Sequence, residues 1–180
     1  ECQKKFYENV DFYKKYLLLR PQEISNSPEV ARRIGVIAMN TAIEVDIYGN
    51  VNSTHVCGTK LMNGVGGSGD FARNGYLTVF FTNSLAKGGK ISSVVPFCSH
   101  IDHATLDVDV IVSERGVADL RGLSPKEKAP IIIDQIANPK YQPWLYDYFK
   151  RACEACGNSQ TPHILAEAFD CYKMFAETGS

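Results

Sequence analysis

Four glycines lie close together between residues 63 and 74, in the stretch NGVGGSGDFARN. Glycine loses more conformational entropy on folding than any other residue, so this cluster indicates backbone that adopts positive φ or approaches another group closely. Ser68 and Asp70 could cap a helix that begins near Phe71. A glycine-rich turn before a helix exposes N–H groups that can bind a phosphate or stabilise an oxyanion. A tight turn without a ligand is the alternative, and the glycines alone favour it.

Two phosphate-binding patterns do not account for this stretch. It lacks the lysine of the pattern G-x-x-x-x-G-K-[ST]. Gly64, Gly66 and Gly69 match G-x-G-x-x-G formally, but no acidic residue closes a βαβ unit about twenty residues later. The glycines therefore predict close approach of the backbone to another group without identifying that group.

Two cysteines near the C-terminus have the spacing of a redox or zinc motif. Cys153 and Cys156 form this pair, and the nearby ligand types in sequence are His163 and Cys171. A structural zinc site needs a second regular ligand pair, which this set does not supply. We interpret the pair as two thiols on a helix that stops at Gly157, and we expect no metal.

Two further groups of polar side chains could act as acids, bases or ligands. His100, Asp102 and His103 could hold a metal or transfer protons, but residues of this kind in a loop after a strand often satisfy backbone groups, and we favour that role. Glu44 and Asp46 share one face of a predicted strand, as a pair of hydrolytic carboxylates might. We interpret them as the polar face of that strand.

The composition is that of an ordinary water-soluble domain. The chain has 180 residues, of which 44% are hydrophobic and 22% charged, enough for one sizeable core. Its net charge of -1 comes from interspersed residues, so we expect neither nucleic acid nor a membrane surface as a partner. Six scattered cysteines indicate reduced thiols in an intracellular compartment. The opening ECQKKFYENVDF lacks an initiator Met and a signal segment, and predicts an internal part of a longer protein.

Hydrophobic periodicity places strands in the middle of the chain and helices on either side. Gly49 and Asn50 break an alternating run and predict a hairpin, while Ser124 to Glu127 form a capping box. Expected helices cover 2–19, 28–35, 124–136, 143–156 and 162–175, with Ser27 and Thr161 as further N-caps; expected strands cover 43–47, 51–56, 77–82, 91–96 and 108–113. The predicted fold class is α/β, with a central mixed β-sheet flanked by helices.

Five segments in order carry a resemblance to a known family. They are LRPQEISNSPEV (19–30), GVIAMNTAIEVDIYGNVNSTHV (35–56), NGVGGSGDFARN (63–74), AKGGKISSVVPFCSHIDH (86–103) and VSERGVADLRGLSP (112–125). Together they resemble the acetyl-CoA hydrolase/transferase family, and within it the C-terminal portion of the acetate-utilising, succinyl-CoA:acetate type of CoA-transferase. The resemblance covers the chain from Leu19 to about His163. It implies that residues 1–180 form a single C-terminal domain of the CoA-transferase, NagB/RpiA-like fold.

The resemblance also implies a covalent mechanism. A glutamate carboxylate attacks an acyl-CoA thioester to form an acyl-glutamyl anhydride and release CoA thiolate. The thiolate then attacks the enzyme's glutamyl carbonyl, so the donor acyl group leaves as its carboxylate and a glutamyl-CoA thioester remains, from which a carboxylate acceptor such as acetate takes the CoA. In the family this glutamate lies upstream of the 19–30 segment, so it should precede Glu1, and we expect the isolated chain to be inactive. CoA and acyl-CoA would be substrates, with no metal. Expected partners are the N-terminal domain of the same polypeptide and further copies in a homo-oligomer, in a mitochondrion-like organelle or the cytoplasm.

Site residues are implied by the same resemblance. Gly67 would donate a backbone N–H to the oxyanion, because a side chain there would block the carbonyl. Lys87 would place a cation near the CoA phosphates, and Glu114 would organise polar neighbours. The CoA and acyl site would be lined by Asn26, Ile43, Gly66, Gly67 and Lys87. Relatives often carry Gly at the position of Cys57 and His or Gln at that of Arg115, which leaves local packing open.

Two alternatives to CoA transfer stay open. An acetyl-CoA hydrolase would resolve the same enzyme thioester with water instead of a carboxylate. A non-catalytic CoA-binding or assembly module would keep the fold and lack the upstream glutamate. Transfer is preferred over hydrolysis because hydrolysis can be a side reaction of the shared intermediate.

Overall fold

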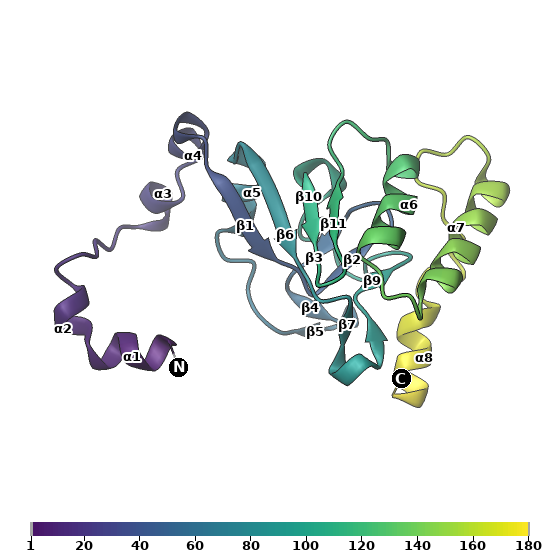
Figure 1. Cartoon of the computed structure of the whole chain (residues 1–180), viewed down its shortest axis with the longest axis horizontal. Coiled ribbons are helices and arrows are strands. Elements are labelled where there is room, and N and C mark those ends of the chain that lie inside the picture. The colour runs from purple at the N-terminus through teal and green to yellow at the C-terminus, as the bar shows by residue number, and fades with distance from the viewer. Residues whose placement is uncertain (1, 180) are drawn as a thin grey trace.

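A four-stranded mixed sheet forms the centre of the chain (Figure 1). In this computed structural model, which describes residues 2–179, the strands lie in the order β1-β6-β10-β11. The first three strands are parallel, with Met39 opposite Val79 and Val79 opposite Val110, and the fourth is antiparallel to β10. The strands are β1 (Ile37–Thr41), β6 (Leu77–Phe81), β10 (Val110–Val112) and β11 (Val117–Asp119). The predicted α/β class with a central mixed sheet is confirmed.

Helices cover this sheet. Helix α5 (Ser68–Asn74) packs on β1, on β6 and on α4 (Pro28–Ile34), while α6 (Pro125–Gln135) packs on β11 and α7 (Gln142–Cys156). The capping box predicted for α6 forms, because the Ser124 N–H donates to Glu127 Oε2 at 2.8 Å and the Ser124 side chain in turn caps the Glu127 N–H. A core of buried aliphatic and aromatic side chains fills the interior, including Val45, Phe80, Ile111, Ile132 and Leu145.

Three smaller sheets lie beside the central one and shape the site. The predicted hairpin at Gly49 and Asn50 joins β2 to β3, and Gly49 has a φ of +89°. These sheets contain β2 (Glu44–Asp46), β3 (Val51–Asn52) and β9 (Val94–Val95); β4 (His55–Val56) and β5 (Lys60–Leu61); and β7 (Leu85–Ala86) and β8 (Ile91–Ser92). Two 3-10 turns, η1 (Lys87–Gly89) and η2 (Thr105–Asp107), complete this part.

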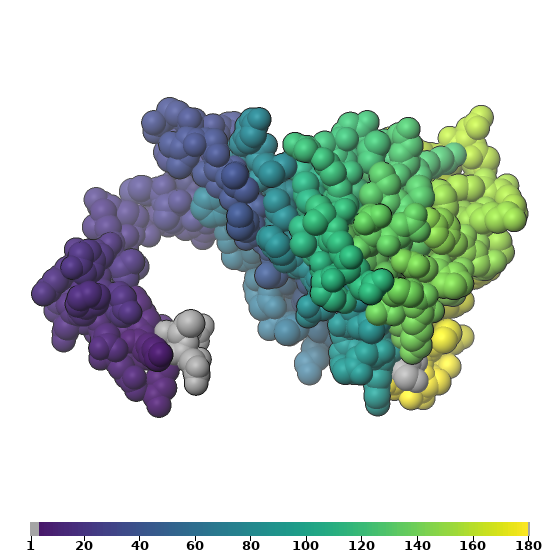
Figure 2. Space-filling model, in the orientation of Figure 1, coloured from purple at the N-terminus to yellow at the C-terminus, as the bar shows by residue number. Residues whose placement is uncertain are grey.

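The N-terminal segment stands away from the rest of the molecule (Figures 1 and 2). A single helix over 2–19 was the wrong prediction, because the segment forms α1 (Cys2–Glu8) and α2 (Val10–Tyr13), followed at a distance by α3 (Gln22–Ser25). Tyr16 and Leu17 of the expected apolar face are 74% and 50% exposed, so no burial stabilises a longer helix. None of the described helices has the length and apolar character needed to cross a lipid bilayer.

Four other elements differ from the prediction. The expected strand 91–96 breaks at Ser93, because Ile91–Ser92 pairs with β7 while Val94–Val95 pairs with β2. The expected strand 51–56 turns after β3, where the Asn52 side chain accepts from the Thr54 and His55 N–H groups. The last helix is α8 (Asp170–Thr178), so Thr161 is not its N-cap. Strand β1 was not predicted.

Candidate active site

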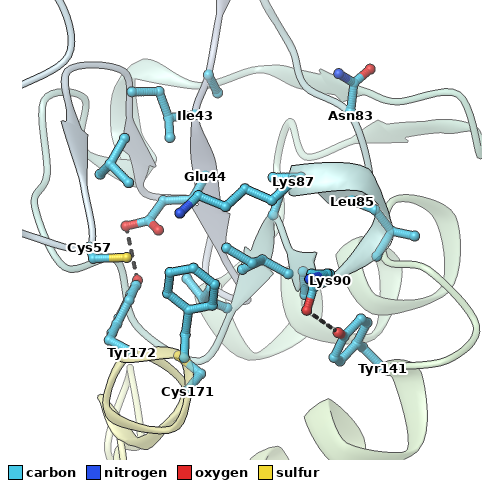
Figure 3. Close-up of a pocket in the computed structure, with 18 of the residues that line it drawn as sticks. Ile43, Glu44, Cys57, Asn83, Leu85, Lys87, Lys90, Tyr141, Cys171 and Tyr172 are labelled. Carbon is cyan, nitrogen blue, oxygen red and sulfur yellow. Dashed lines mark hydrogen bonds between the residues drawn. The ribbon is translucent and has the colours of Figure 1, made fainter. Parts of the chain in front are cut away.

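A cavity of about 930 Å³ opens between the small sheets, the start of α7 and helix α8 (Figure 3). Two of the predicted site residues line it, Ile43 from the chain before β2 and Lys87 from the turn after β7. Helix α8 adds one face through side chains spaced three to four residues apart, and its contribution comprises Cys171, Tyr172, Met174 and Phe175. The cavity thus combines aliphatic and aromatic walls with a few polar groups, as binding sites for small organic molecules do.

Lys87 projects from a backbone segment that favours glycine. Lys87 has a φ of +48°, and Gly88 and Gly89 have φ values of +66° and +91°. Three consecutive left-handed residues turn the chain sharply between β7 and β8, and glycine makes two of them inexpensive. The Lys87 ammonium lies 4.3 Å from the centre of the Phe175 ring, so the cation is held at the cavity by α8.

Glu44 is the acidic group of the cavity. Its side chain is buried, and the Oε1 atom accepts hydrogen bonds from Asn52 Nδ2 at 2.9 Å, the Ser99 hydroxyl at 2.8 Å and the Tyr172 hydroxyl at 2.9 Å. The interpretation of Glu44 and Asp46 as a polar strand face needs correction, because β2 is buried along its whole length. Asp46 instead organises the hairpin by accepting from the Tyr48 and Asn50 N–H groups.

The cavity also contains two thiols, Cys57 and Cys171. Burial raises the pKa of Cys57, and the nearby Glu44 carboxylate raises it further while Lys87 opposes the change. Burial raises the pKa of Cys171 to about 12. Both thiols are therefore protonated at neutral pH, and neither supplies a thiolate nucleophile.

Glu114 lines a smaller cleft of about 420 Å³ next to the main cavity. The two spaces share three lining residues, Thr41, Ala42 and Asn83. The Ser84 N–H donates to Glu114 Oε2 at 2.8 Å, and the Ser84 hydroxyl donates to Oε1. Partial burial alone would raise the pKa of Glu114, but these hydrogen bonds outweigh it and lower the pKa below its ordinary value. The geometry places an ionised carboxylate beside the main cavity.

The glycine stretch forms a turn that leads directly into α5. The helix begins at Ser68 with Gly67 at the N-cap, so the expected capping by Ser68 and Asp70 is wrong. The Ser68 hydroxyl instead donates to the Val65 carbonyl at 2.8 Å, and Gly66 has a φ of +58°. Among the described residues, none accepts a hydrogen bond from the Gly66 or Gly67 N–H.

Asn26 lies against Gly67. A Cβ atom on Gly67 would be 2.1 Å from Asn26 Nδ2, so the absence of a side chain at residue 67 allows this contact. Asn26 Nδ2 also donates to Asp70 Oδ2 at 3.3 Å. The structure thus brings Asn26, Gly66 and Gly67 together at the start of α5, and none of them lines either of the two cavities described above.

In the cluster of His100, Asp102 and His103, hydrogen bonds tie the Asp102 carboxylate to a neighbouring loop. Asp102 accepts from the Ser53 N–H at 2.8 Å and from the Thr54 hydroxyl, as expected for a residue that satisfies a loop. Among the side chains that the structure describes, no group of three or more from His, Cys, Asp or Glu is placed to hold a metal ion. Cys153 and Cys156 lie on α7, which ends before Gly157 as predicted.

Comparison with known proteins identifies the family. Residues 2–149 match the acetyl-CoA hydrolase/transferase C-terminal domain. The chain belongs to the acetyl-CoA hydrolase/transferase family. The resemblance seen in the five sequence segments is confirmed by this match.

Three relatives in this family illustrate its range of activities. The chain is 60% identical to a succinyl-CoA:acetate CoA-transferase of Clostridium kluyveri, over 97% of this chain and 32% of the relative. It is 52% identical to a propanoyl-CoA:succinate CoA transferase of Escherichia coli, over 98% of the chain and 35% of the relative. It is 49% identical to an acetyl-CoA hydrolase of Candida albicans, with the same coverages. The chain therefore spans about a third of the length of these relatives.

Solved structures support the family fold. RipA from Yersinia pestis superposes with a TM-score of 0.63 at 29% identity, covering 73% of this chain and 30% of that one. A 4-hydroxybutyrate CoA-transferase from Porphyromonas gingivalis superposes with a TM-score of 0.56 at 25% identity, covering 73% of this chain and 31% of that one. CoA transfer or acetyl-CoA hydrolysis is named for the three sequence relatives, and CoA transfer for the Porphyromonas gingivalis protein.

The sequence did not single out several residues that shape the site. Tyr172 and Phe175 come from α8, which lies far from Glu44 and Lys87 in sequence. Their spacing on one helix face was the available signal, but that spacing equally predicts a core-facing helix. Ser84 gave no signal as the partner of Glu114, because the two residues are 30 positions apart.

Proposed function

We propose that the protein carrying this chain is a CoA-transferase, which moves CoA between an acyl-CoA such as acetyl-CoA or succinyl-CoA and a small carboxylate such as acetate. One observation carries this proposal: a largely apolar cavity lined by Ile43 and Lys87 lies next to the cleft that contains Glu114. The chain that forms this cavity belongs to the acetyl-CoA hydrolase/transferase family. The proposed route is a glutamyl-CoA thioester on an upstream glutamate.

The described residues have chemistry suited to each part of this substrate. The Lys87 ammonium can pair with CoA phosphate, and Ile43 and the aromatic wall can pack on the aliphatic part of CoA. Glu114 would orient polar groups near the reacting centre. Gly67 would donate its free N–H to the oxyanion, with Gly66 and Asn26 forming the adjacent wall.

The remainder of the active site would come from the N-terminal domain of the same polypeptide. The relatives are about three times as long as the matched region, and the proposed glutamate lies upstream of it. Apolar side chains on 12–19 support such a contact, because Phe12, Tyr16, Leu18 and Leu19 are all more than half exposed. We also infer a homo-oligomeric, intracellular protein, and expect the chain alone to be inactive.

Hydrolysis is the second candidate function. A relative with about half of its residues identical to this chain is named an acetyl-CoA hydrolase. Water would then replace the carboxylate acceptor in the last step, with the same thioester before it. A non-catalytic CoA-binding module would form no such thioester.

The full-length protein tests these candidates directly. It should be incubated with acetyl-CoA, treated with hydroxylamine, and digested for mass spectrometry. The proposal expects a glutamyl hydroxamate on one upstream peptide, together with faster transfer of CoA from acetyl-CoA to succinate than release of CoA to water. Release to water alone would assign the hydrolase, and a protein that binds CoA without forming any adduct would be the binding module.

The Gly67→Ala substitution tests the proposed oxyanion donor in the full-length protein. The added methyl group keeps the backbone N–H but blocks the approach of the carbonyl to it. Because losing one oxyanion contact costs about 100-fold in rate, we expect kcat to fall by roughly that factor with a smaller change in CoA affinity. The control is the same substitution with Asn26→Ala, since the added methyl group would otherwise contact Asn26 Nδ2. If Asn26→Ala alone and the double variant have equal kcat, the loss comes from the steric contact and the donor role is contradicted.

A further inference from the structure

A buried histidine lies directly behind the glycine turn. The His103 side chain is fully buried, and its ring centre lies 4.8 Å from that of Phe80. Its Nε2 atom is 3.0 Å from the Ser68 hydroxyl and 3.5 Å from the Ser53 hydroxyl. Nδ1 has no hydrogen-bond partner among the described residues.

The Ser68 contacts assign the proton on this imidazole. A serine hydroxyl has one proton, and that of Ser68 lies 2.8 Å from the Val65 carbonyl, which can only accept. His103 Nε2 must then carry the hydrogen that meets Ser68 Oγ. The unpartnered Nδ1 is left as a lone pair, whereas the opposite tautomer would bury an N–H without an acceptor.

The charge of the ring agrees with this assignment. Burial lowers the pKa of His103; the carboxylates of Asp102 and Asp107 oppose the change, and Arg73 adds to it. Burial prevails, so the ring is neutral at neutral pH and has one N–H to donate. Backbone hydrogen bonds on both sides hold the residue, from His103 N–H to Val51 O at 3.1 Å and from Val51 N–H to His103 O at 2.9 Å.

Ser68 closes the turn whose centre is the glycine pair. Both its hydroxyl and, at 3.4 Å, its N–H donate to Val65 O, so residues 65 to 68 form a turn around Gly66 and Gly67. The free N–H groups of these glycines are directed by that turn. A group that orients the Ser68 hydroxyl therefore influences where the Gly67 N–H points.

We propose that His103 is a positioning residue for acyl transfer: its Nε2–H holds the Ser68 hydroxyl on the Val65 carbonyl and thereby fixes the Gly67 N–H toward the reacting carbonyl. This inference rests on the proposed function. His103 touches neither substrate nor the reacting atoms. It connects the glycine turn to β3, so the N–H is preorganised before substrate binds.

The test compares His103→Leu with His103→Gln in the full-length protein. The Gln amide nitrogen can occupy the place of Nε2 and donate to Ser68, whereas Leu cannot donate. We expect kcat for CoA transfer to fall about tenfold in His103→Leu, with KM within about twofold of the wild type. The loss in kcat is smaller than that for removing an oxyanion donor, because the Gly67 N–H remains but is less well oriented. His103→Gln should recover kcat to within about threefold of the wild type.

A double-variant cycle with Ser68→Ala decides whether the effect passes through Ser68. In the Ser68→Ala background, His103→Leu should lower kcat no further. His163→Leu is the control for losing a partly buried imidazole, since His163 packs on Phe97 and Tyr48, away from the turn, and should leave kcat unchanged. If the wild type exchanges CoA, three results would overturn the positioning role alone. These are an unchanged kcat in His103→Leu, a kcat that His103→Gln does not recover, and losses from His103→Leu and Ser68→Ala that add in the double variant. A wild type without CoA exchange would overturn the proposed function first.

Discussion

Cys57 adopts a backbone conformation that favours glycine. Its φ is +49°, and it is followed by Gly58 at +72°. A side chain in this left-handed region costs about 1–2 kcal/mol through contact between Cβ and the carbonyl. The sharp turn between β4 and β5 therefore carries backbone strain, which glycine at residue 57 would relieve.

Cys57→Gly should stabilise the protein. Removing the strain stabilises the folded state by more free energy than the greater conformational entropy of glycine gives to the unfolded state. We therefore expect the free energy of unfolding, measured by urea denaturation, to rise by about 0.5–1 kcal/mol. Cys57→Ala is the matched control, because it removes the thiol and keeps the Cβ. Equal gains from Ala and Gly would point to the thiol and contradict the backbone explanation.

At the scale of elements, α8 forms one wall of the cavity through a small number of polar contacts. The Tyr172 hydroxyl lies 2.9 Å from Glu44 Oε1 and 3.1 Å from the Phe97 carbonyl, and it accepts from the Ser99 N–H at 3.1 Å. No residue of α8 is fully buried. The helix therefore depends on this hydroxyl more than on hydrophobic burial.

Tyr172→Phe should loosen α8 without unfolding the rest. A hydrogen bond to a charged group contributes about 1.5–3 kcal/mol, so amide hydrogen exchange in 170–178 should accelerate by roughly tenfold or more, while exchange in the central sheet stays unchanged. Tyr146→Phe on α7 is the control, since that hydroxyl bonds Asp134 at 2.9 Å away from the cavity. Unchanged exchange in α8 of Tyr172→Phe would show that other contacts hold the helix.

At the scale of the whole molecule, buried titratable groups act on stability in opposite directions. Burial lowers the pKa of His103 and of His163 from 6.5, so the folded state favours their neutral forms and loses stability as the pH falls below about 6.5. Burial raises the pKa of Asp46 from 3.8 to about 6, although hydrogen bonds from Asn50 oppose it. Protonation of Asp46 therefore stabilises the folded state increasingly as the pH falls through 6.

Replacing both histidines should change the pH dependence in a defined direction. In His103→Gln/His163→Gln the histidine contribution disappears while that of Asp46 stays. We therefore expect the free energy of unfolding of the variant, relative to the wild type, to increase as the pH falls from 7 to 5, by urea denaturation at each pH. A difference that is the same at both pH values would contradict neutral burial of these rings.

Local signals in the sequence predicted the local features of this fold. The capping box at Ser124, the left-handed Gly35 that ends α4 and the hairpin at Gly49 each depend on neighbouring residues and formed as expected. The five family segments identified the acyl-CoA family because their order and residue types are specific. The proposed roles of Gly67, Lys87 and Glu114 rest on that resemblance.

Only the tertiary structure decided which of these residues meet. Two contacts join residues that are distant in sequence: Tyr172 covers the buried Glu44, and Asn26 lies against Gly67. The expected strand at 91–96 is divided at Ser93 between two sheets. Periodicity reports the environment along one element and carries no information on its partner. The sequence thus determined the family and the local turns. Tertiary packing decided the rest: α8 forms one wall of the cavity, and Asn26 packs on the glycine turn, because long-range contacts set both.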